Sequence, residues 1–428
     1  MKFALPIVAT VLLLLAGRAV AVTMIGNHVA VYDASGMLQP WTSWDDIIER
    51  EVNWYSRCPV EHGYPCFVYL TFMDGNYQAD TNASSSIPAM QDGMGILSYL
   101  KYYNYKQKHD PRPLQMARYL GNYLVNEAIT PDTGKYPRFS RSTGWAAKFP
   151  QPPDCGSQGD HPFEIQPDKG GIAGYALLLL FETTENQKYF QQALQNAHDL
   201  VANMREGTAT NSPWPFRADY RTGEPRGDVS GDMTYILRLF DELIVLGHPE
   251  FKSSRDKLWW WIKQFQIPNA ADDGRLWVQF FEDHEESDNR TAWSPLNLAR
   301  YLIEKKGALD PDWQEDSRTL IEFVNSRFIT VRDGVAVCGE QNNDMNPWGG
   351  ILSTYGAVLA MYSQASGSNE FKAVARQALN YALYSVNEDG CPCDLATHAG
   401  RGGWQEDAHN DKLHNVLDAI SAFPEWRK

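Results

Sequence analysis

Pairs of helical segments repeat along this chain at a regular spacing, and this repeat limits the possible folds more than any other feature. Apolar, often glycine-rich segments begin near residues 93, 170, 229, 291, 348 and 408. Equivalent positions in successive units lie 57–62 residues apart, except for one gap of 79 residues. A single helical hairpin cannot bury its apolar face alone, so such a repeat predicts hairpins packed against their neighbours.

Amphipathic segments follow the apolar ones and complete the hairpins. They run near residues 112–128, 186–204, 250–266, 312–327 and 369–386, and residues 44–56 supply a sixth at the other end of the chain. Because the missing partner of the last hairpin precedes the first hairpin, the sequence predicts an all-α (α/α)6 toroid, closed by helices from both ends. The apolar helices would form its inner barrel. The alternative is an open α-solenoid without a central funnel.

Each amphipathic segment is followed by a turn and a short extended tail, such as Gly63-Tyr-Pro-Cys-Phe and Asp333-Gly-Val-Ala-Val-Cys. Aromatic and β-branched residues after a turn are typical of short strands. In a toroid these tails lie on the face where the loops enter the inner helices. We expect a cleft on that face, together with the insertion at residues 145–164 that accounts for the long gap.

The first 21 residues have the pattern of an export signal. Lys2 precedes an apolar run from Phe3 to Ala16, and Ala19-Val-Ala is a small-residue cleavage site. The run is too short to span a membrane. We therefore expect a signal peptide at residues 1–21, one toroid domain at residues 22–428, and a secreted or periplasmic location.

Acidic residues outnumber basic ones. The formal net charge is −15, and it becomes −17 once Lys2 and Arg18 are removed with the signal peptide. This balance argues against nucleic acid or an anionic membrane as the main partner. No residue pattern indicates a cofactor or a metal site, and we expect a monomer.

Six cysteines in an exported chain suggest disulfides. Cys58 and Cys66 are close enough in sequence to clip a local loop. Cys391 and Cys393 are too near each other for an easy mutual bridge, so we expect Cys338 to be bonded to one of them. Asn289-Arg-Thr is one of two glycosylation sequons.

Acidic residues recur just before or at the start of the apolar segments, namely Asp92, Asp168, Asp232, Asp344 and Asp407. Helix capping explains any one of them, because a carboxylate accepts backbone N–H bonds at a helix N-terminus. In a toroid, however, these positions meet on one rim. Two carboxylates in different surroundings could act there as an acid and a base or nucleophile. Our predicted catalytic residues are Asp92, Asp168 and Asp232, with His161 from the insertion.

Aromatic and arginine side chains are expected on the same rim. Flat apolar rings beside carboxylates suit a sugar, and a guanidinium binds the carboxylate of an acidic sugar in two places. The predicted substrate-binding residues are Tyr136, Arg138, Trp145, Trp214, Arg217, Trp293, Trp348 and Trp404.

The chain resembles the six-hairpin group of sugar-active toroids, which contains glycosidases and polysaccharide lyases. The most specific part is Trp214-Pro-Phe-Arg followed by Asp228-Val-Ser-Gly-Asp232-Met-Thr-Tyr, which looks like a tail and inner-helix start of toroidal pectate lyases. The resemblance implies an enzyme that cleaves glycosidic bonds in a poly- or oligosaccharide. Hydrolysis by paired carboxylates is the first expectation. Alternatives are β-elimination on glycans that contain uronic acid, and a glycan-binding toroid without activity.

A second motif suggests a different class of protein. Cys338-Gly-Glu-Gln341 is similar to the signature of complement-type thioester domains, which are also (α/α)6 toroids. That resemblance implies a thioester between Cys338 and Gln341, whereas a disulfide at Cys338 would prevent it.

Overall fold

The computed structural model describes residues 23–428, except 71–72, 74, 78–84, 146–159, 281, 284–287 and 394–404. At residues 85, 144–145 and 405–408 it describes the backbone only. The expected signal peptide lies outside the described residues.

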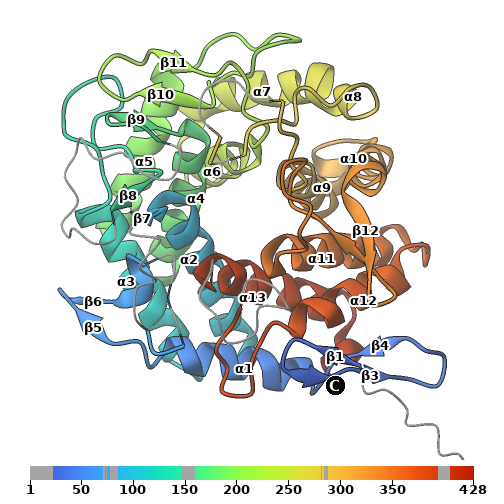
Figure 1. The fold of residues 1–428 in the computed structure, drawn as a ribbon. Helices are drawn as coiled ribbons and strands as arrows, with labels where there is room; N and C mark the ends of the chain where they lie inside the picture. The colour runs from blue at the N-terminus through green and yellow to red at the C-terminus, as the bar shows by residue number, and fades with distance from the viewer. Residues whose placement is uncertain are drawn as a thin grey trace, which may run out of the picture.

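Within this part of the chain, six inner helices form a closed ring (Figure 1). They are α2 (Pro88–Tyr105), α4 (Pro167–Thr184), α6 (Thr234–Val245), α9 (Trp293–Lys305), α11 (Gly349–Ser366) and α13 (Gln405–Ala422). Each inner helix contacts the next one in chain order, and α13 contacts α2. This closure, in place of an open solenoid, confirms the toroid predicted from the spacing of the apolar segments.

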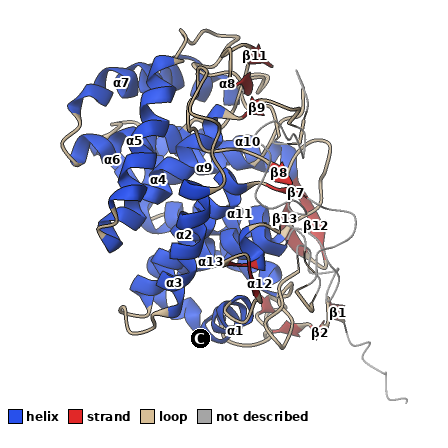
Figure 2. Cartoon of the chain, turned by 90° about the vertical axis from the view of Figure 1, so that its left-hand side faces the viewer, coloured by secondary structure: helices blue, strands red, loops and turns tan. Residues whose placement is uncertain are grey.

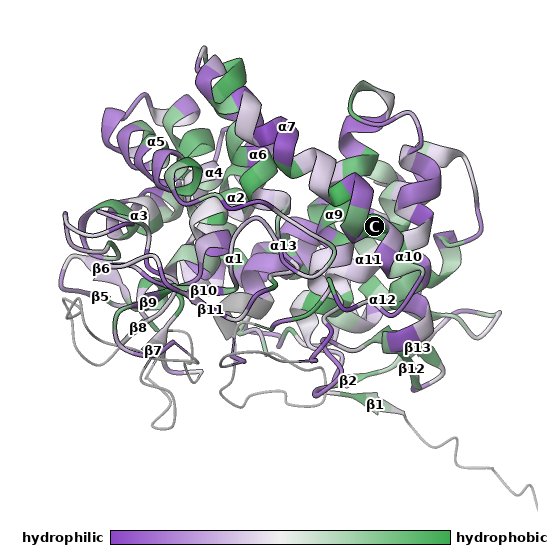
Figure 3. Ribbon diagram, turned by 90° about the horizontal axis from the view of Figure 1, so that it is seen from above, coloured by the Kyte–Doolittle hydropathy of each residue, from purple (hydrophilic) through white to green (hydrophobic). Residues whose placement is uncertain are grey.

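The outer layer supplies one partner to each inner helix. Its helices are α1 (Trp44–Tyr55), α3 (Arg112–Asn126), α5 (Gln187–Ala202), α7 (Lys252–Trp261), α10 (Trp313–Phe328) and α12 (Lys372–Leu383). Helix α7 continues through a π-helical turn at Ile262–Gln266 into the short helix α8 (Ile267–Ala270). Figure 3 shows hydrophilic stretches on α7 and hydrophobic ones on α4 and α6, as the amphipathic pattern requires.

The two ends of the chain meet at the last hairpin. Trp44 at the start of α1 packs edge-on against Trp426, with ring centroids 5.8 Å apart. The ammonium group of Lys412 on α13 lies 2.9 Å from a carboxylate oxygen of Glu51 on α1. These contacts place the N-terminal amphipathic segment beside the C-terminal apolar one, as expected.

Two glycines on α4 allow the inner helices to approach closely. A Cβ atom added at Gly171 would lie 2.7 Å from the Ile236 side chain, and one at Gly174 would lie 2.8 Å from Leu239. Both neighbours are on α6, and both contacts are shorter than real side chains tolerate. The glycine content of the inner segments is therefore needed for packing between helices.

Short antiparallel strands gather on one face of the ring (Figure 2). The pairs are β1 (Met24–Ile25) with β2 (His28–Val29), β3 (Val31–Tyr32) with β4 (Leu38–Gln39), β5 (Val60–Glu61) with β6 (Tyr64–Pro65), β7 (Ser85–Ser86) with β8 (Gly144–Trp145), and β12 (Ile329–Arg332) with β13 (Val335–Cys338). A three-stranded sheet joins β9 (Glu164–Ile165), β10 (Arg217–Asp219) and β11 (Pro225–Arg226).

The predicted extended tails are only partly strands. Those at residues 63–67 and 333–338 contain β6 and β13, and the tail at 212–217 ends in β10. The other three are turns flanked by single bridges, such as Ile129 with Ser140 and Val278 with Arg290. Aromatic residues favoured strands in the sequence, but here their rings fill the core between the layers.

The expected disulfides are not formed among the five described cysteines. The Cys338 thiol donates to the Gly339 carbonyl oxygen at 3.3 Å, so the predicted bridge from Cys338 to Cys391 or Cys393 is wrong for this structure. Its side chain is fully buried, and burial raises the pKa of this thiol well above its usual value. No helix in the described part of the chain has the length and apolarity needed to cross a membrane.

Candidate functional site

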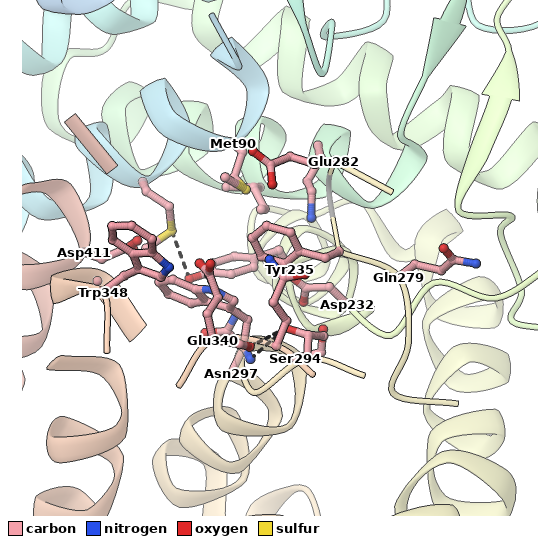
Figure 4. Close-up of a pocket in the computed structure, with 18 of the residues that line it drawn as sticks. Met90, Asp232, Tyr235, Gln279, Glu282, Ser294, Asn297, Glu340, Trp348 and Asp411 are labelled. Atoms are coloured by element: carbon pink, nitrogen blue, oxygen red, sulfur yellow. Dashed lines mark hydrogen bonds between the residues drawn. The ribbon is translucent and has the colours of Figure 1, made fainter. Parts of the chain in front are cut away.

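A pocket opens at the N-terminal ends of the inner helices (Figure 4). All six inner helices or the loops that enter them contribute to its wall, which is acidic and aromatic. The described residues that line it include Met90, Met94, Lys169, Asp232, Tyr235, Glu282, Trp293, Ser294, Asn297, Glu340, Gln341, Asp344, Trp348, Gly350 and Asp411. Because the positive ends of six parallel helix dipoles point towards this pocket, carboxylates are favoured there.

Asp232 lies in the loop that leads into α6, and the loop is held on several sides. The backbone N–H of Ser230 donates to the Ser212 hydroxyl at 2.9 Å, and that of Gly231 donates to the Val278 carbonyl at 3.2 Å. From the outer layer, the Gln266 amide donates to the Gly231 carbonyl at 2.8 Å. The position of Asp232 is therefore set by tertiary contacts, in addition to the start of its own helix.

The Asp232 carboxyl group is poorly solvated. Its Oδ1 atom is sealed from solvent and accepts no hydrogen bond from the described residues, while Asn297 and the backbone of Thr234 bond to the group. Burial raises the pKa of Asp232 to about 6, against the opposing effect of the Lys169 ammonium group. A carboxyl group with this pKa can hold and release a proton near neutral pH.

Asp168 and Lys169 form an ion pair at the first turn of α4. The Lys169 Nζ atom lies 3.1 Å from Asp168 Oδ2, and the Ser230 hydroxyl donates to the same oxygen at 3.0 Å. Burial alone would lower the pKa of Lys169, but the carboxylates of Asp168 and Asp232 more than offset this and raise it. Lys169 is therefore a cation inside the pocket wall.

Two tryptophans in the pocket are fixed by carboxylates from the loop that precedes α11. The Trp293 indole N–H donates to Glu340 Oε1 at 2.9 Å, and the Trp348 indole N–H donates to Asp344 Oδ2 at 2.9 Å. Both rings are half-buried. Each ring is thus held at its polar edge, and part of its surface remains accessible from the pocket.

Asp411 lies on α13, which is the third inner helix from α6 in either direction around the ring. A Cβ atom at Gly350 would lie 3.2 Å from Asp411 Oδ2 and 2.9 Å from the ring of Trp293. Glycine at this position therefore lets the carboxylate and the aromatic ring approach the same point. Burial raises the pKa of Tyr235, whose side chain also lines the pocket, and the carboxylates of Asp232 and Asp411 add to this rise.

The loops on one side of the pocket are joined through Asn289. Its amide nitrogen donates to both carboxylate oxygens of Asp283 at 3.2 Å and also to Gln341 Oε1, and its amide oxygen accepts from the N–H of Asn343 at 3.2 Å. Asn289 is only 3% exposed, so its amide is not accessible as a glycosylation acceptor in the folded protein. The side-chain oxygen of Gln341 accepts a hydrogen bond from Asn289, and the Cys338 thiol donates one to the Gly339 carbonyl oxygen. Neither group of the suggested thioester is therefore directed at the other.

Asp232, Trp293 and Trp348 line the pocket, and Asp168 lies behind it through its ion pair with Lys169. These four predicted site residues are thus brought together. Asp92 is on α2 between the lining residues Met90 and Met94 but is itself 1% exposed and not part of the lining.

The other predicted residues lie elsewhere. His161 is solvent-exposed beside Glu164, with 3.5 Å between Nδ1 and Oε1, and Arg138 is exposed. Tyr136 and Trp214 are core residues, 1% and 0% exposed, and the Trp214 indole donates to the Leu200 carbonyl at 2.8 Å. These two rings offer no surface to a sugar in this structure.

Arg217 is buried in an ion pair, with its Nε atom 2.5 Å from Asp160 Oδ1. Asp160 also accepts hydrogen bonds from Ser142 and Thr143, so the arginine binds the insertion to β10 and is not in the pocket lining. The side chain of Trp145 and all of Trp404 lie outside the described residues.

Sequence reasoning missed several lining residues. Lys169 follows a predicted catalytic aspartate directly, and Glu340 and Gln341 belong to the motif that suggested a thioester. Tyr235 is the second residue of α6 and Asn297 lies one turn into α9, and the search for acidic, aromatic and arginine residues in the loops did not include these positions. Asp411 is two turns into α13, so the search for acids immediately before the inner helices did not reach it.

Several solved structures with a similar fold are named as enzymes that act on sugars. The cellobiose 2-epimerase of Bacillus thermoamylovorans B4167 shares 12% identity at a TM-score of 0.63, over 88% of this chain and 98% of its own. A GH76 α-mannanase of Bacteroides thetaiotaomicron shares 9% sequence identity at a TM-score of 0.56, and the match covers 90% of this chain and 98% of the mannanase. A polysaccharide lyase shares 12% sequence identity at a TM-score of 0.53, and the match covers 88% of this chain and 96% of the lyase.

At these identities the likeness shows the fold, the (α/α)6 toroid of carbohydrate-active enzymes, and leaves the reaction open. No family model and no curated protein matches the sequence. The predicted resemblance to six-hairpin sugar-active toroids is confirmed at the level of the fold.

Proposed function

We propose that this protein is a glycoside hydrolase that cleaves a poly- or oligosaccharide in the pocket at the inner-helix N-termini. The observation that carries the proposal is the Asp232 carboxyl group. It lines the pocket with one oxygen, Oδ1, sealed from solvent, its pKa is raised to about 6, and it lies across the ring from a second carboxyl group, that of Asp411. Two carboxyl groups in different surroundings are the basic requirement for glycoside hydrolysis.

In this proposal Asp232 is the general acid. Its carboxyl proton moves to the glycosidic oxygen as the bond from that oxygen to the anomeric carbon breaks, so the leaving sugar departs as a neutral alcohol. Water supplies the new oxygen at the anomeric carbon and loses its proton to a carboxylate. Asp411 is the proposed acceptor, since it is held beside the Trp293 ring at the opposite wall.

The aromatic rings support a sugar as the ligand. Trp293 and Trp348 are oriented by carboxylates that accept hydrogen bonds from their indole N–H groups, so the rings can present their faces to the C–H faces of a sugar. The epimerase, the mannanase and the lyase with a similar fold are all named for carbohydrate chemistry. They support carbohydrate as the substrate class.

Elimination from a uronide is the main alternative. It requires a base and a positive group that neutralises the sugar carboxylate. In the described lining, Lys169 is the one cationic side chain, it is already paired with Asp168, and five carboxyl groups accompany it. This balance favours a neutral sugar over a uronic acid. In keeping with the N-terminal signal pattern, we also propose that the enzyme acts after export.

Incubation with a panel of neutral and acidic glycans, followed by product analysis, tests this proposal. New reducing ends that lack ultraviolet absorbance are expected, and Asp232→Asn and Asp411→Asn should abolish them. Asp199→Asn is the matched control, because Asp199 is a buried carboxyl group on the outer helix α5. Unsaturated products would indicate a lyase, and binding without products in the wild type would indicate a glycan-binding protein. Either result would overturn hydrolysis.

A further inference from the structure

The ion pair at the start of α4 suggests a specific role that goes beyond the identity of the acid. We propose that Asp168 and Lys169 are positioning residues for the reaction: Asp168, together with Ser230, fixes the Lys169 ammonium group at the pocket wall, where it stabilises the Asp232 carboxylate left after proton transfer. This inference rests on the proposed function, because it assigns a task within the same reaction.

Two contacts with one carboxylate oxygen of Asp168 determine where the ammonium group can be. Lys169 Nζ lies 3.1 Å from Asp168 Oδ2, and Ser230 Oγ lies 3.0 Å from the same oxygen. Ser230 belongs to the loop that carries Asp232, two residues further on. The lysine side chain is 10% exposed and the Asp168 side chain 2% exposed, so the pair is enclosed and cannot reorient freely. The Asp168 carboxylate therefore connects the Lys169 ammonium group to the loop that carries Asp232.

Enclosure makes the charge of Lys169 effective. Charges interact more strongly where water is excluded than at an exposed surface. Lys169 and Asp168 have opposite effects on Asp232: the ammonium group lowers the pKa of Asp232, and the Asp168 carboxylate raises it. Each residue of the ion pair can therefore be tested by the direction in which its removal shifts the pKa of Asp232.

Other groups surround the acid as well. The titratable and charged groups nearest to it in the fold are Asp168 and Lys169 on α4 and Tyr235 on α6, and the other pocket walls carry Glu282, Glu340, Asp344 and Asp411. Lys169 is the cation among them. Removing it therefore leaves the newly formed Asp232 carboxylate facing only neutral and acidic groups of the described lining.

The test measures the pKa of Asp232 itself, with the full chain labelled with carbon-13 at its aspartate carboxyl carbons. The Asp232 resonance is identified as the signal that disappears in Asp232→Asn. We expect Lys169→Met to raise this pKa and Asp168→Asn to lower it, while Lys169→Arg leaves it close to the wild-type value. If Lys169→Met does not fold, because it leaves Asp168 buried without its cation, the double variant Asp168→Asn/Lys169→Met still decides by comparison with Asp168→Asn, since both lack the Asp168 carboxylate and only the single variant keeps the ammonium group. A pKa of Asp232 that is no higher without the ammonium group than with it would overturn the proposal.

Activity separates this inference from the proposed function. On a glycan that the wild type cleaves, Lys169→Met should lower kcat at least tenfold and extend the remaining activity to higher pH, whereas Asp168→Asn should shift the alkaline limb of the pH profile to lower pH. If the pKa values move as expected but Asp232→Asn remains active, the electrostatic arrangement stands and the assignment of the acid fails. If Asp232→Asn is inactive but the pKa values do not move, the positioning role fails alone.

Discussion

The inner barrel contains two clusters of charged side chains, and they differ in how their carboxylates are compensated. At the pocket end, Asp232 and Asp168 share the single cation Lys169. At the C-terminal ends of the inner helices, Asp418 on α13 has two cations: its carboxylate lies 2.5 Å from Lys101 Nζ and 3.4 Å from an Arg300 guanidinium nitrogen. The first cluster lines a pocket, and the second joins α13 to α2 and α9 through ion pairs.

The protonation of the two aspartates follows from this difference. Burial would raise the pKa of both, but Lys101 and Arg300 hold the pKa of Asp418 well below its usual value, whereas Lys169 only partly offsets burial at Asp232, whose pKa rises to about 6. The same barrel therefore contains one aspartate that stays ionised at neutral pH and one that titrates near neutral pH. A perturbed pKa in a group that lines a pocket marks a candidate functional residue, so Asp232 is the candidate of the two.

The largest expected effect is on activity at the pocket end. Asp232→Asn removes the proposed acid and should lower kcat/KM by about 10²–10⁴. Stability should not decrease, because the amide has the same shape and carries no buried charge. Steady-state kinetics on a cleaved glycan and thermal unfolding provide the two measurements. If Asp232→Asn has activity close to that of the wild type, Asp232 is not the acid and the pocket cluster has no catalytic role of this kind.

At the closed end the same type of change should affect stability instead. Asp418→Asn leaves Lys101 and Arg300 without their carboxylate and should lower the free energy of unfolding by about 2–4 kcal/mol, somewhat less than for a fully buried pair, because the Lys101 side chain is 29% exposed. The activity of the folded fraction should remain. Denaturant titration beside a kinetic assay distinguishes this result from a loss of catalysis.

The pH dependence of stability should also differ in sign between the two ends. The pKa of Asp232 is raised from 3.8 to about 6, so its contribution to stability is greatest below pH 4 and is lost as pH rises to about 6. Asp232→Asn should therefore be more stable than the wild type by about 1–3 kcal/mol at pH 8 and equal to it near pH 3. For Asp418, whose folded pKa is lowered, the contribution is present above about pH 4 and is lost in acid.

Asp199 on α5 is a control for this titration. Burial raises its pKa to about 7, and it is 5% exposed in the outer layer, away from the pocket lining. Asp199→Asn should stabilise the protein at pH 8 in the same way as Asp232→Asn but leave activity unchanged. Equal loss of activity in both variants would show that charge removal in the fold, rather than the acid, is responsible.

The smallest expected effect concerns the aromatic wall. Trp348→Ala should weaken glycan binding by about tenfold through the loss of a buried ring face, with little effect on kcat. The matched control is Trp260→Ala, because Trp260 lies on the outer helix α7 and is 53% exposed. Isothermal titration with the inactive Asp232→Asn protein provides the measurement, and equal affinities for both tryptophan variants would exclude Trp348 as a sugar platform.

Much of the fold could be predicted from the chain alone. The spacing of apolar segments gives the hairpins, and the unpaired helices at residues 44–56 and after residue 408 give ring closure. Helix periodicity is a local property that each segment carries in its own residues. For the same reason the sequence indicated where carboxylates would meet, because the positive ends of all inner helices face one way.

Tertiary packing decided which of those residues form the pocket. Trp214 and Trp348 look alike in the sequence, each beside a proline in a loop, yet one ring is packed in the core and the other lines the pocket. Arg217 was expected to bind substrate but is paired with Asp160, which is separated from it by 57 residues in sequence. The environment of a side chain depends on neighbours that are distant in sequence, and no local pattern specifies them. The pKa of Asp232 has the same origin, since burial raises it and the position of one lysine on another helix partly offsets that rise.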